Sequence, residues 1–230
     1  METVFVTGAD RGVGYSLCEQ FLELGYRVIG SQFMPQWPDL DKLKEKYPEQ
    51  LFIVPMDVGN TESVERAAEM TKTYTDKIDI LINCAGIFGT DEEETFKAIL
   101  NVNSVGPMRV TKALLPLMEN GKKRLCFFSS ESGAVATQPR GDDGGSAYCI
   151  SKAMLNMQVK LLFNELRPDG YTFRIYHPGW VRSYMSGVKS TVGKLEPEES
   201  AQIAVRQFIE DRTFEDVLLL VDVYDSIYAF

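Results

Sequence analysis

Short apolar runs alternate with longer amphipathic segments along most of the chain. The short runs are rich in β-branched and aromatic residues, and several are almost continuously apolar, as strands covered on both faces should be. We expect strands at 4–6, 27–29, 51–54, 78–82, 125–128, 173–176 and 217–221. Segments of helical period lie between them, at roughly 12–24, 39–47, 61–75, 92–118, 147–167 and 197–210.

The repeated order strand, helix, strand predicts right-handed crossovers and therefore a parallel sheet with helices on both faces. The expected fold class is α/β, with a single doubly wound, Rossmann-type sheet. No linker divides the chain, so residues 1–230 are expected to form one domain. Two loops, at about 131–147 and 182–196, should lie past the carboxyl ends of strands, where open α/β sheets bind ligands. The first of them contains the Gly/Asp-rich stretch 137–145.

Composition and charge narrow the classes of function. Apolar residues make up 44% of the chain and charged residues 25%, which is ordinary globular usage and argues against disorder, collagen and coiled coil. The net charge of −9 disfavours a nucleic-acid partner. No run reaches the roughly 18 apolar residues of a membrane helix, and no export signal is visible. We therefore expect a cytoplasmic protein without a membrane partner.

Metal binding is not expected from the cysteine and histidine content. The cysteines are widely spaced without a C-x-x-C pair, and the lone His177 cannot complete a Cys/His zinc site. His177 is interpreted as a structural or loop-anchoring residue. The cysteines are interpreted as reduced and mostly buried thiols: Cys18, Cys84, Cys126 and Cys149.

A glycine-rich turn joins the first expected strand to the first expected helix. Its sequence is Thr7-Gly8-Ala9-Asp10-Arg11-Gly12-Val13-Gly14. Glycine is needed where the backbone turns tightly or approaches a pyrophosphate closely, and the helix N-terminus presents free N–H groups to phosphates. A glycine cluster alone indicates only a turn. At the first strand-to-helix junction of an alternating chain it predicts a dinucleotide-binding site.

The spacing of these glycines, Gly-x-x-x-Gly-x-Gly, resembles that of the classical short-chain dehydrogenase/reductase family. Further motifs that resemble this family follow in order up to about residue 183: Asp57-Val58, Asn83-Cys84-Ala85-Gly86, Asn103, Ser130, Tyr148-Cys149-Ile150-Ser151-Lys152, Pro178-Gly179 and Ser183. Cys84 replaces the family's second asparagine, and Ser183 replaces its usual threonine. Segments 177–185 and 196–200 resemble, in addition, the sniffer and C-factor-like carbonyl reductase branch.

The resemblance implies a set of residues that contact a nicotinamide dinucleotide. The set is Gly8, Arg11, Gly12, Val13, Gly14, Gln32, Asp57, Val58, Asn83, Ala85, Gly86, Tyr148, Lys152, Pro178, Gly179, Val181 and Ser183. The second expected strand ends at Gly30-Ser31-Gln32-Phe33, without the carboxylate that NAD enzymes usually offer to the ribose 2′-hydroxyl. NADP(H) is therefore favoured and NAD(H) stays open. Arg11 is a candidate partner for the 2′-phosphate, the alternative being an exposed arginine in a polar loop.

Tyr148 and Lys152 are four residues apart, so a helix would place both side chains on one face. A tyrosine is a poor base at its free pKa of about 10, and a nearby ammonium favours its phenolate. The resemblance implies that Tyr148 is the general acid/base and that Lys152 binds the nicotinamide ribose. It also implies that Ser130 binds the substrate oxygen and that Asn103 holds a water of the proton relay. The plain alternative is a Tyr/Lys pair on a solvated helix face.

The expected function is the NADPH-linked reduction of a small carbonyl compound to an alcohol. One alternative is a cofactor-binding sensor or signalling protein, which the presence of both Tyr148 and Lys152 disfavours. Another is an epimerase or dehydratase of the extended type, which the short chain beyond the last expected strand disfavours. The apolar positions of 147–167 could face the sheet or a second copy, so a homodimer or homotetramer stays open.

Overall fold

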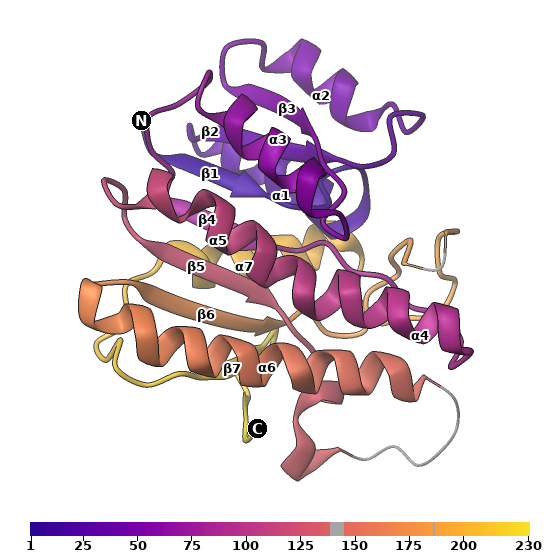
Figure 1. Ribbon diagram of the computed structural model, residues 1–230. Helices are drawn as coiled ribbons and strands as arrows, with labels where there is room; N and C mark the ends of the chain where they lie inside the picture. Colours follow the sequence, from indigo (N-terminus) through magenta and orange to yellow (C-terminus); the bar gives the residue numbers. More distant parts are fainter. Residues whose placement is uncertain (139–144, 186) are drawn as a thin grey trace.

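The computed structural model describes residues 1–138, 145–185 and 187–230, and Figure 1 shows a twisted sheet between layers of helices. Within these ranges, eight strands form a sheet in the order β3-β2-β1-β4-β5-β6-β7-β8. The chain first runs outward from β1 to β3 and then restarts at β4 on the other side of β1. The strand order therefore reverses between β1 and β4, which is where doubly wound sheets open a crevice for ligands.

The strands are β1 (Thr3–Val6), β2 (Arg27–Gln32), β3 (Leu51–Pro55), β4 (Ile80–Asn83), β5 (Arg124–Phe128), β6 (Thr172–His177), β7 (Leu220–Asp222) and β8 (Ile227–Tyr228). The α-helices are α1 (Gly12–Glu23), α2 (Asp39–Lys46), α3 (Thr61–Thr71), α4 (Glu93–Leu100), α5 (Gly106–Met118), α6 (Ser146–Leu166) and α7 (Pro197–Ile209). A π-helical turn, η1 (Asn101–Val105), joins α4 to α5. The 3-10 turns are η2 (Glu131–Gly133), η3 (Val135–Thr137) and η4 (Arg167–Asp169).

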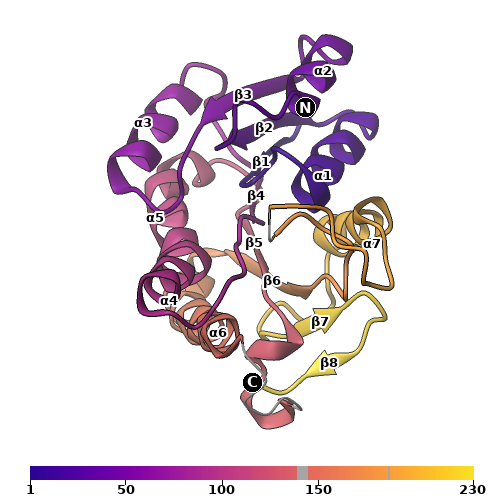
Figure 2. The same cartoon turned by 90° about the vertical axis from the view of Figure 1, so that its right-hand side faces the viewer.

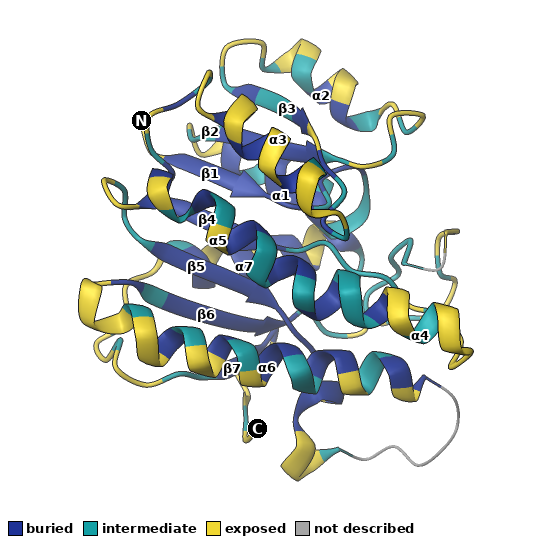
Figure 3. Cartoon of the chain, viewed as in Figure 1, coloured by how far each residue is buried: buried dark blue, intermediate teal, exposed yellow. Residues whose placement is uncertain are grey.

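Helices cover both faces of the sheet. Figure 2 shows α3, α4, α5 and α6 on one face and α1 and α7 on the other. Each face has its own apolar layer, the first built from residues such as Val64, Val110 and Leu155 and the second from residues such as Leu17, Phe21 and Phe208. The strands are accordingly buried almost throughout in Figure 3. This double coverage explains why their sequences are continuously apolar.

The register brings the carboxyl ends of the central strands level with one another. Val6 at the end of β1 lies opposite Gly30 on β2 and Ile82 on β4, with parallel pairing on both sides. The loops that follow these three strands therefore start from one edge of the sheet. No helix in the described ranges is long and apolar enough to cross a membrane.

The α/β prediction with a doubly wound sheet is confirmed, whereas several boundaries were wrong. The last predicted strand begins at Leu220 instead of residue 217, and β8 pairs with β7 in antiparallel orientation, so the sheet is not wholly parallel. The strand β8 was not predicted, because two residues are too few to show the alternation of polar and apolar positions that indicates a strand. The predicted helix 92–118 is divided by the π-helical turn η1, and the predicted helix 61–75 ends at Thr71.

Candidate active site

The glycine turn lies across the carboxyl ends of β1 and β4. The Thr7 hydroxyl accepts hydrogen bonds from the backbone N–H groups of Cys84 (2.9 Å) and Ala85 (3.0 Å). Gly8 has a φ of +68°, and a Cβ there would lie 2.9 Å from the Cα of Ala85. A Cβ at Gly14 would overlap the carbonyl oxygen of Gly8. Glycine is therefore required at both positions to keep the turn closed against β4 and against the start of α1.

The same turn is fastened to the end of β2. The Asp10 carboxylate accepts hydrogen bonds from the backbone N–H groups of Phe33 (2.9 Å) and Met34 (2.7 Å). Beside them, Nε2 of Gln32 is buried and has no hydrogen-bond partner. A buried amide donor without a partner is costly unless a ligand satisfies it. The end of β2 thus offers a donor where the sequence predicts the ribose.

Arg11 lies between two loops instead of extending into solvent. Its guanidinium carbon is 4.8 Å from the ring centre of Trp37 and 5.8 Å from that of Tyr184. Nη2 of Arg11 donates a hydrogen bond to the Tyr184 carbonyl oxygen at 3.1 Å. The neighbouring Gly12 has a φ of +59°, and a Cβ there would lie 3.7 Å from the Tyr184 ring. Val13, which follows it, packs against the apolar layer of α1.

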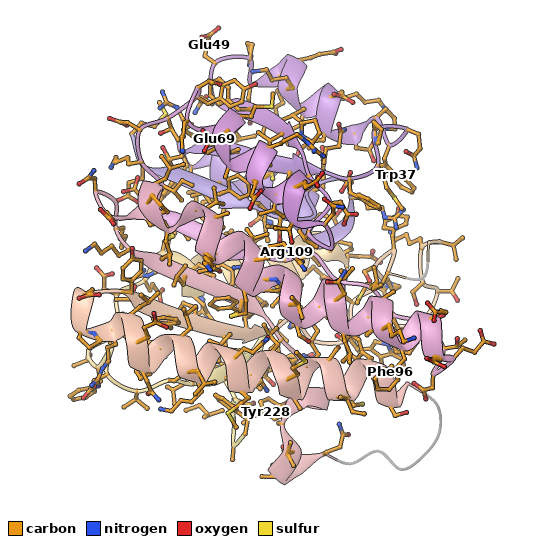
Figure 4. All side chains as sticks on the ribbon, viewed as in Figure 1. Trp37, Glu49, Glu69, Phe96, Arg109 and Tyr228 are labelled. Carbon is orange, nitrogen blue, oxygen red and sulfur yellow. The ribbon has the colours of Figure 1, made fainter. Side chains whose placement is uncertain are left out.

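Asp57 and Val58, after β3, belong to a loop that is fixed to α3 and α5. The Asp57 N–H donates to the Ser63 hydroxyl at 3.0 Å. The Val58 carbonyl oxygen accepts from Nη1 of Arg109 at 2.5 Å. Figure 4 shows Arg109 on α5, and the same guanidinium also donates to the side chain of Asn101 in the π-helical turn. This pair, which the resemblance assigns to the dinucleotide, therefore has a defined position after β3.

Asn83 and Gly86 mark the wall of the crevice at β4. Asn83 is 3% exposed, and its Nδ2 donates to the Thr111 hydroxyl at 3.3 Å. Its Oδ1 is buried without a hydrogen-bond partner. A Cβ at Gly86 would lie 3.4 Å from Oδ1 of Asn103 and 3.8 Å from Nζ of Lys152. Gly86 therefore keeps the space beside these two groups open.

The π-helical turn places the Asn103 amide between two other segments. Oδ1 accepts from the Ile87 N–H at 2.8 Å, and Nδ2 donates to the Ile87 carbonyl (2.9 Å) and the Ser151 hydroxyl (3.1 Å). Ser104 adds a bond of 2.7 Å from its hydroxyl to the Ser151 carbonyl. The amide therefore connects α6 to the segment after β4. A relay water on this side chain would have to use the second lone pair of Oδ1.

Tyr148 and Lys152 lie on α6, and Ser130 follows the end of β5. Lys152 is 3% exposed, and its Nζ donates to the Phe128 carbonyl at 2.8 Å. The same Nζ lies 5.6 Å from the centre of the Tyr148 ring, which confirms that both side chains occupy one face of α6. Oγ of Ser130 accepts from the Ser132 N–H at 3.1 Å and begins the turn η2. This turn packs on α6, because a Cβ at Gly133 would overlap the Lys152 backbone.

Burial sets the ionisation of the groups around Lys152. Burial lowers the pKa of the Lys152 ammonium to about 8, with the neighbouring Cys84 acting in the opposite direction. Burial also raises the pKa of the Cys84 thiol to about 12. At neutral pH the lysine is therefore mostly charged and Cys84 is a neutral thiol, so the site holds one buried cation beside the tyrosine.

His177 is the last residue of β6. Its Nε2 is 3.9 Å from a Glu131 oxygen, and its ring meets the Tyr228 ring edge to face at 6.0 Å. Tyr228, labelled in Figure 4, donates its hydroxyl proton to Asp222 at 3.1 Å. Burial lowers the His177 pKa, although Glu131 and Asp222 oppose the effect. These contacts support the interpretation of His177 as an anchor for β8.

The residues after β6 lead into the loop predicted as 182–196. Gly179 has a φ of +74°, and Val181 forms an isolated parallel bridge with Leu195 that closes the base of the loop. The Pro178 carbonyl accepts from the Ser200 hydroxyl at 2.8 Å. The Ser183 N–H donates to the Val181 carbonyl at 2.8 Å. Of the other predicted loop, residues 139–144 lie outside the described residues.

The predicted residues therefore follow the carboxyl ends of the parallel strands, and the polar groups there suit a dinucleotide. Two buried polar atoms without hydrogen-bond partners, Gln32 Nε2 and Asn83 Oδ1, lie at the ends of β2 and β4. Glycines in the turn after β1 would allow a ligand to approach its backbone. Three contributors were not predicted. Trp37 contacts Arg11, and the Phe88 ring lies 5.4 Å from the Tyr148 ring, but neither residue belongs to a recognisable sequence motif. Asp91 contacts α6 from 54 residues away or more, which no spacing rule detects.

Comparison with known proteins agrees with this geometry. The short chain dehydrogenase family model matches residues 2–192. The chain is 31% identical over 205 residues to estradiol 17-beta-dehydrogenase 2 of Mus musculus, covering 86% of this chain and 52% of the mouse protein. It is 37% identical over 133 residues to C-signal of Myxococcus xanthus, covering 53% and 76%. The chain thus spans about half the length of the first of these relatives.

Solved structures show the same fold. A carbonyl reductase from Pseudomonas aeruginosa PAO1 has 29% identity and a TM-score of 0.84, with full coverage of both chains. A short-chain dehydrogenase/reductase from Burkholderia multivorans with bound NADP has 25% identity and a TM-score of 0.86, covering 100% and 99%. Carbonyl reductase Sniffer of D. melanogaster, at 24% identity and a TM-score of 0.88 over both full chains, shares the fold. The chain belongs to the short-chain dehydrogenase/reductase family.

Proposed function

We propose that this oxidoreductase reduces a small carbonyl compound to an alcohol with NADPH and that Tyr148 donates the proton. The observation that carries the proposal is the buried Lys152 ammonium, 5.6 Å from the centre of the Tyr148 ring. A cation held near a phenol stabilises the phenolate that remains after proton donation. The bound dinucleotide supplies the hydride.

The residues of this chain act on the carbonyl oxygen and on its proton. The Tyr148 hydroxyl donates a proton to that oxygen, and the Ser130 hydroxyl donates a hydrogen bond to it, so charge that develops there is stabilised. Nζ of Lys152 keeps two donors beyond its bond to Phe128, and these would bind ribose hydroxyls. Asn103 positions α6 through Ser151 and would hold the relay water.

The preference for NADPH rests on charge at the end of β2. Gln32 and Phe33 stand where an NAD enzyme usually carries a carboxylate, and Arg11 brings a cation to the same side of the crevice. We propose that the other predicted cofactor residues, which follow the ends of these strands from the glycine turn to Ser183, also contact the dinucleotide. The NADP-bound Burkholderia structure supports the choice by similarity.

A small carbonyl substrate is supported by similarity and by the surface of the crevice. The Pseudomonas carbonyl reductase and C-signal are similar in sequence, which favours the sniffer and C-factor-like branch. Around the crevice, Phe88 and Val188 are exposed at 43% and 70%, respectively. Exposed apolar side chains at a binding edge favour apolar carbonyl compounds.

The proposal is tested by the initial rates of NADPH and NADH oxidation with quinones, aldehydes, diketones and ketosteroids. We expect turnover of at least one class, with kcat/KM for NADPH about tenfold or more above that for NADH, which corresponds to about 1.4 kcal/mol. A Ser130→Ala variant should reduce kcat with every accepted substrate. Tight cofactor binding without turnover of any carbonyl would contradict the proposal and favour a sensor.

A further inference from the structure

Three side chains from distant parts of the sequence form a cluster at the crevice: Arg11, Trp37 and Tyr184. Arg11 comes from the glycine turn, Trp37 from the loop between β2 and α2, and Tyr184 from the loop after β6. The Trp37 and Tyr184 ring centres are 5.2 Å apart in an edge-to-face arrangement, and the guanidinium contacts both rings. Figure 4 shows Trp37 at the side of the molecule toward which the central strands point.

The charge of Arg11 is left unpaired within this cluster. No carboxylate in the described part of the chain forms an ion pair with its guanidinium, and Nη2 donates a hydrogen bond to the Tyr184 carbonyl. A guanidinium has five N–H donors in a planar fork. Most of the donors therefore stay available to an anion, while the aromatic rings fix the plane in which they lie.

Trp37 is itself held in place. Its indole Nε1 donates to Oδ2 of Asp39 at 2.9 Å, and the other Asp39 oxygen faces Lys42 at 3.6 Å. The Asp39 carboxylate, at the start of α2, is thus engaged by two other donors. On the opposite side, the Tyr184 carbonyl fixes one end of the guanidinium. Both aromatic residues therefore restrict the motion of Arg11 before any ligand arrives.

We propose that Trp37 and Tyr184 are specificity-determining residues that hold Arg11 as a preformed receptor for the phosphate on the ribose 2′ position. The inference rests on the proposed preference for NADPH and goes beyond it, because it assigns part of that preference to two residues that do not carry the charge. A planar cation that is already oriented loses less conformational entropy when it binds a phosphate. Without the rings, Arg11 would retain its charge but not its orientation.

Calorimetric titration with 2′,5′-ADP and 5′-AMP tests this without turnover, since the two ligands differ only in the 2′-phosphate. The ratio of their dissociation constants is measured for the parent, Arg11→Ala, Trp37→Leu and Tyr184→Leu. We expect the parent to prefer 2′,5′-ADP by about tenfold or more, Arg11→Ala to abolish the preference, and each ring variant to reduce it about fivefold. Trp37→Phe, which retains a ring, should restore most of the preference.

Trp180→Leu is the matched control, because Trp180 is also a tryptophan after β6, is 61% exposed and is not one of the two rings that hold Arg11. Its ligand ratio should equal that of the parent. Unchanged affinity for 5′-AMP shows that a variant has folded. The inference would be overturned if Arg11→Ala lost the preference while Trp37→Leu and Tyr184→Leu kept the full parental ratio. This outcome would leave the proposed NADPH preference intact. An unchanged ratio in Arg11→Ala, or no preference in the parent, would overturn the proposed NADPH preference as well.

Discussion

At the scale of a single residue, Lys152 is a buried charge that lowers the stability of the fold and that we propose to be retained for function. Its side chain is almost wholly buried, and burial lowers its pKa from 10.5 to about 8. The hydrogen bond to the Phe128 carbonyl replaces only part of the lost hydration. At pH 7 the folded protein must therefore hold an ammonium that would be more stable in water.

Replacement of this lysine by methionine should stabilise the fold. A pKa lowered by this amount corresponds to a cost of up to about 3 kcal/mol, and loss of the bond to Phe128 offsets part of it. We expect Lys152→Met to unfold at pH 7 with a free energy about 1–2 kcal/mol higher than the parent, although it should lose reductase activity. Denaturant unfolding of both proteins at pH 7 provides the measurement.

The pH dependence gives a second check on the same pair of proteins. Between the folded pKa near 8 and the unfolded pKa near 10.5, the unfolded chain binds more protons at Lys152 than the folded chain does. Stability of the parent therefore rises with pH in this window. The gap between Lys152→Met and the parent should narrow at pH 9.5. A constant gap, or a methionine variant less stable than the parent at pH 7, would rule out the account of Lys152.

At the scale of an element, α6 depends on a capping residue from elsewhere in the chain. Its N-cap position is Gly145, with a φ of +91° and no side chain. Instead, the Asp91 carboxylate accepts bonds from the N–H groups of Gly145 (3.2 Å), Ser146 (3.2 Å) and Ala147 (2.8 Å). The Ser146 hydroxyl donates to it as well, and these bonds hold the Asp91 pKa below its usual range. The first turn that carries Tyr148 is thus fixed by a charge that complements the helix dipole.

Asp91→Ala should loosen this turn. We expect amide hydrogen exchange at Gly145, Ser146 and Ala147 to accelerate about fivefold or more. The kcat should fall while the cofactor dissociation constant stays close to that of the parent, because the glycine turn proposed to bind the phosphates lies between β1 and α1. Asp91→Asn retains one acceptor oxygen and should recover part of both losses.

Glu94→Ala is the control for this prediction. Glu94 lies on the exposed side of α4 near Asp91 and pairs with Lys97 at 3.0 Å. Its removal should change neither amide exchange in α6 nor kcat. Exchange rates in Asp91→Ala that match those of Glu94→Ala would show that Asp91 does not position the helix.

The helix α6 was predicted from the sequence, whereas its capping residue Asp91 was not. The strands, the glycine turn and the Tyr148–Lys152 pair were predicted because each depends on neighbours within a few residues. Asp91, Trp37 and the partners of Arg11 were not, because their contacts join segments that only tertiary packing brings together. The π-helical turn η1 was missed for a related reason: its residues have ordinary helical character, and the bonds from Asn103 to Ile87 and Ser151 are long-range.

At the scale of the whole molecule, two buried arginines on β5 and β6 connect the sheet to the C-terminal end of α7. Arg124 and Arg174 are each 1% exposed and bind carbonyl oxygens at the end of α7. Glu215 accepts two bonds of 2.7 Å from Arg174. The network ties α7 and the segment after it to β5 and β6. Because the sheet also takes strands from both ends of the chain, we propose that residues 1–230 form a single domain.

Glu215→Ala should therefore destabilise the whole fold. Removal of one partner leaves the buried Arg174 guanidinium without its carboxylate, and we expect a loss of about 2 kcal/mol in the free energy of unfolding. Burial acts to raise the Glu215 pKa, but the bonds from Arg174 outweigh it and the pKa is lowered. The stabilisation should thus disappear as pH falls below the ordinary range of a glutamate. The free energy of unfolding is measured in urea for Glu215→Ala and for the control Asp216→Ala, which changes the neighbouring residue. An equal free energy in the two variants would show that the ion pair with Arg174 does not stabilise the fold.

The proton-donor role of Tyr148 is tested most directly by the rate of NADPH oxidation in Tyr148→Phe and in the parent at saturating carbonyl substrate. The change removes only the hydroxyl and keeps the ring that lies 5.4 Å from the Phe88 ring. We predict a fall in kcat of about 100-fold or more, with a cofactor dissociation constant within about twofold of the parent. Parental turnover in Tyr148→Phe would contradict the assignment of Tyr148 as the acid.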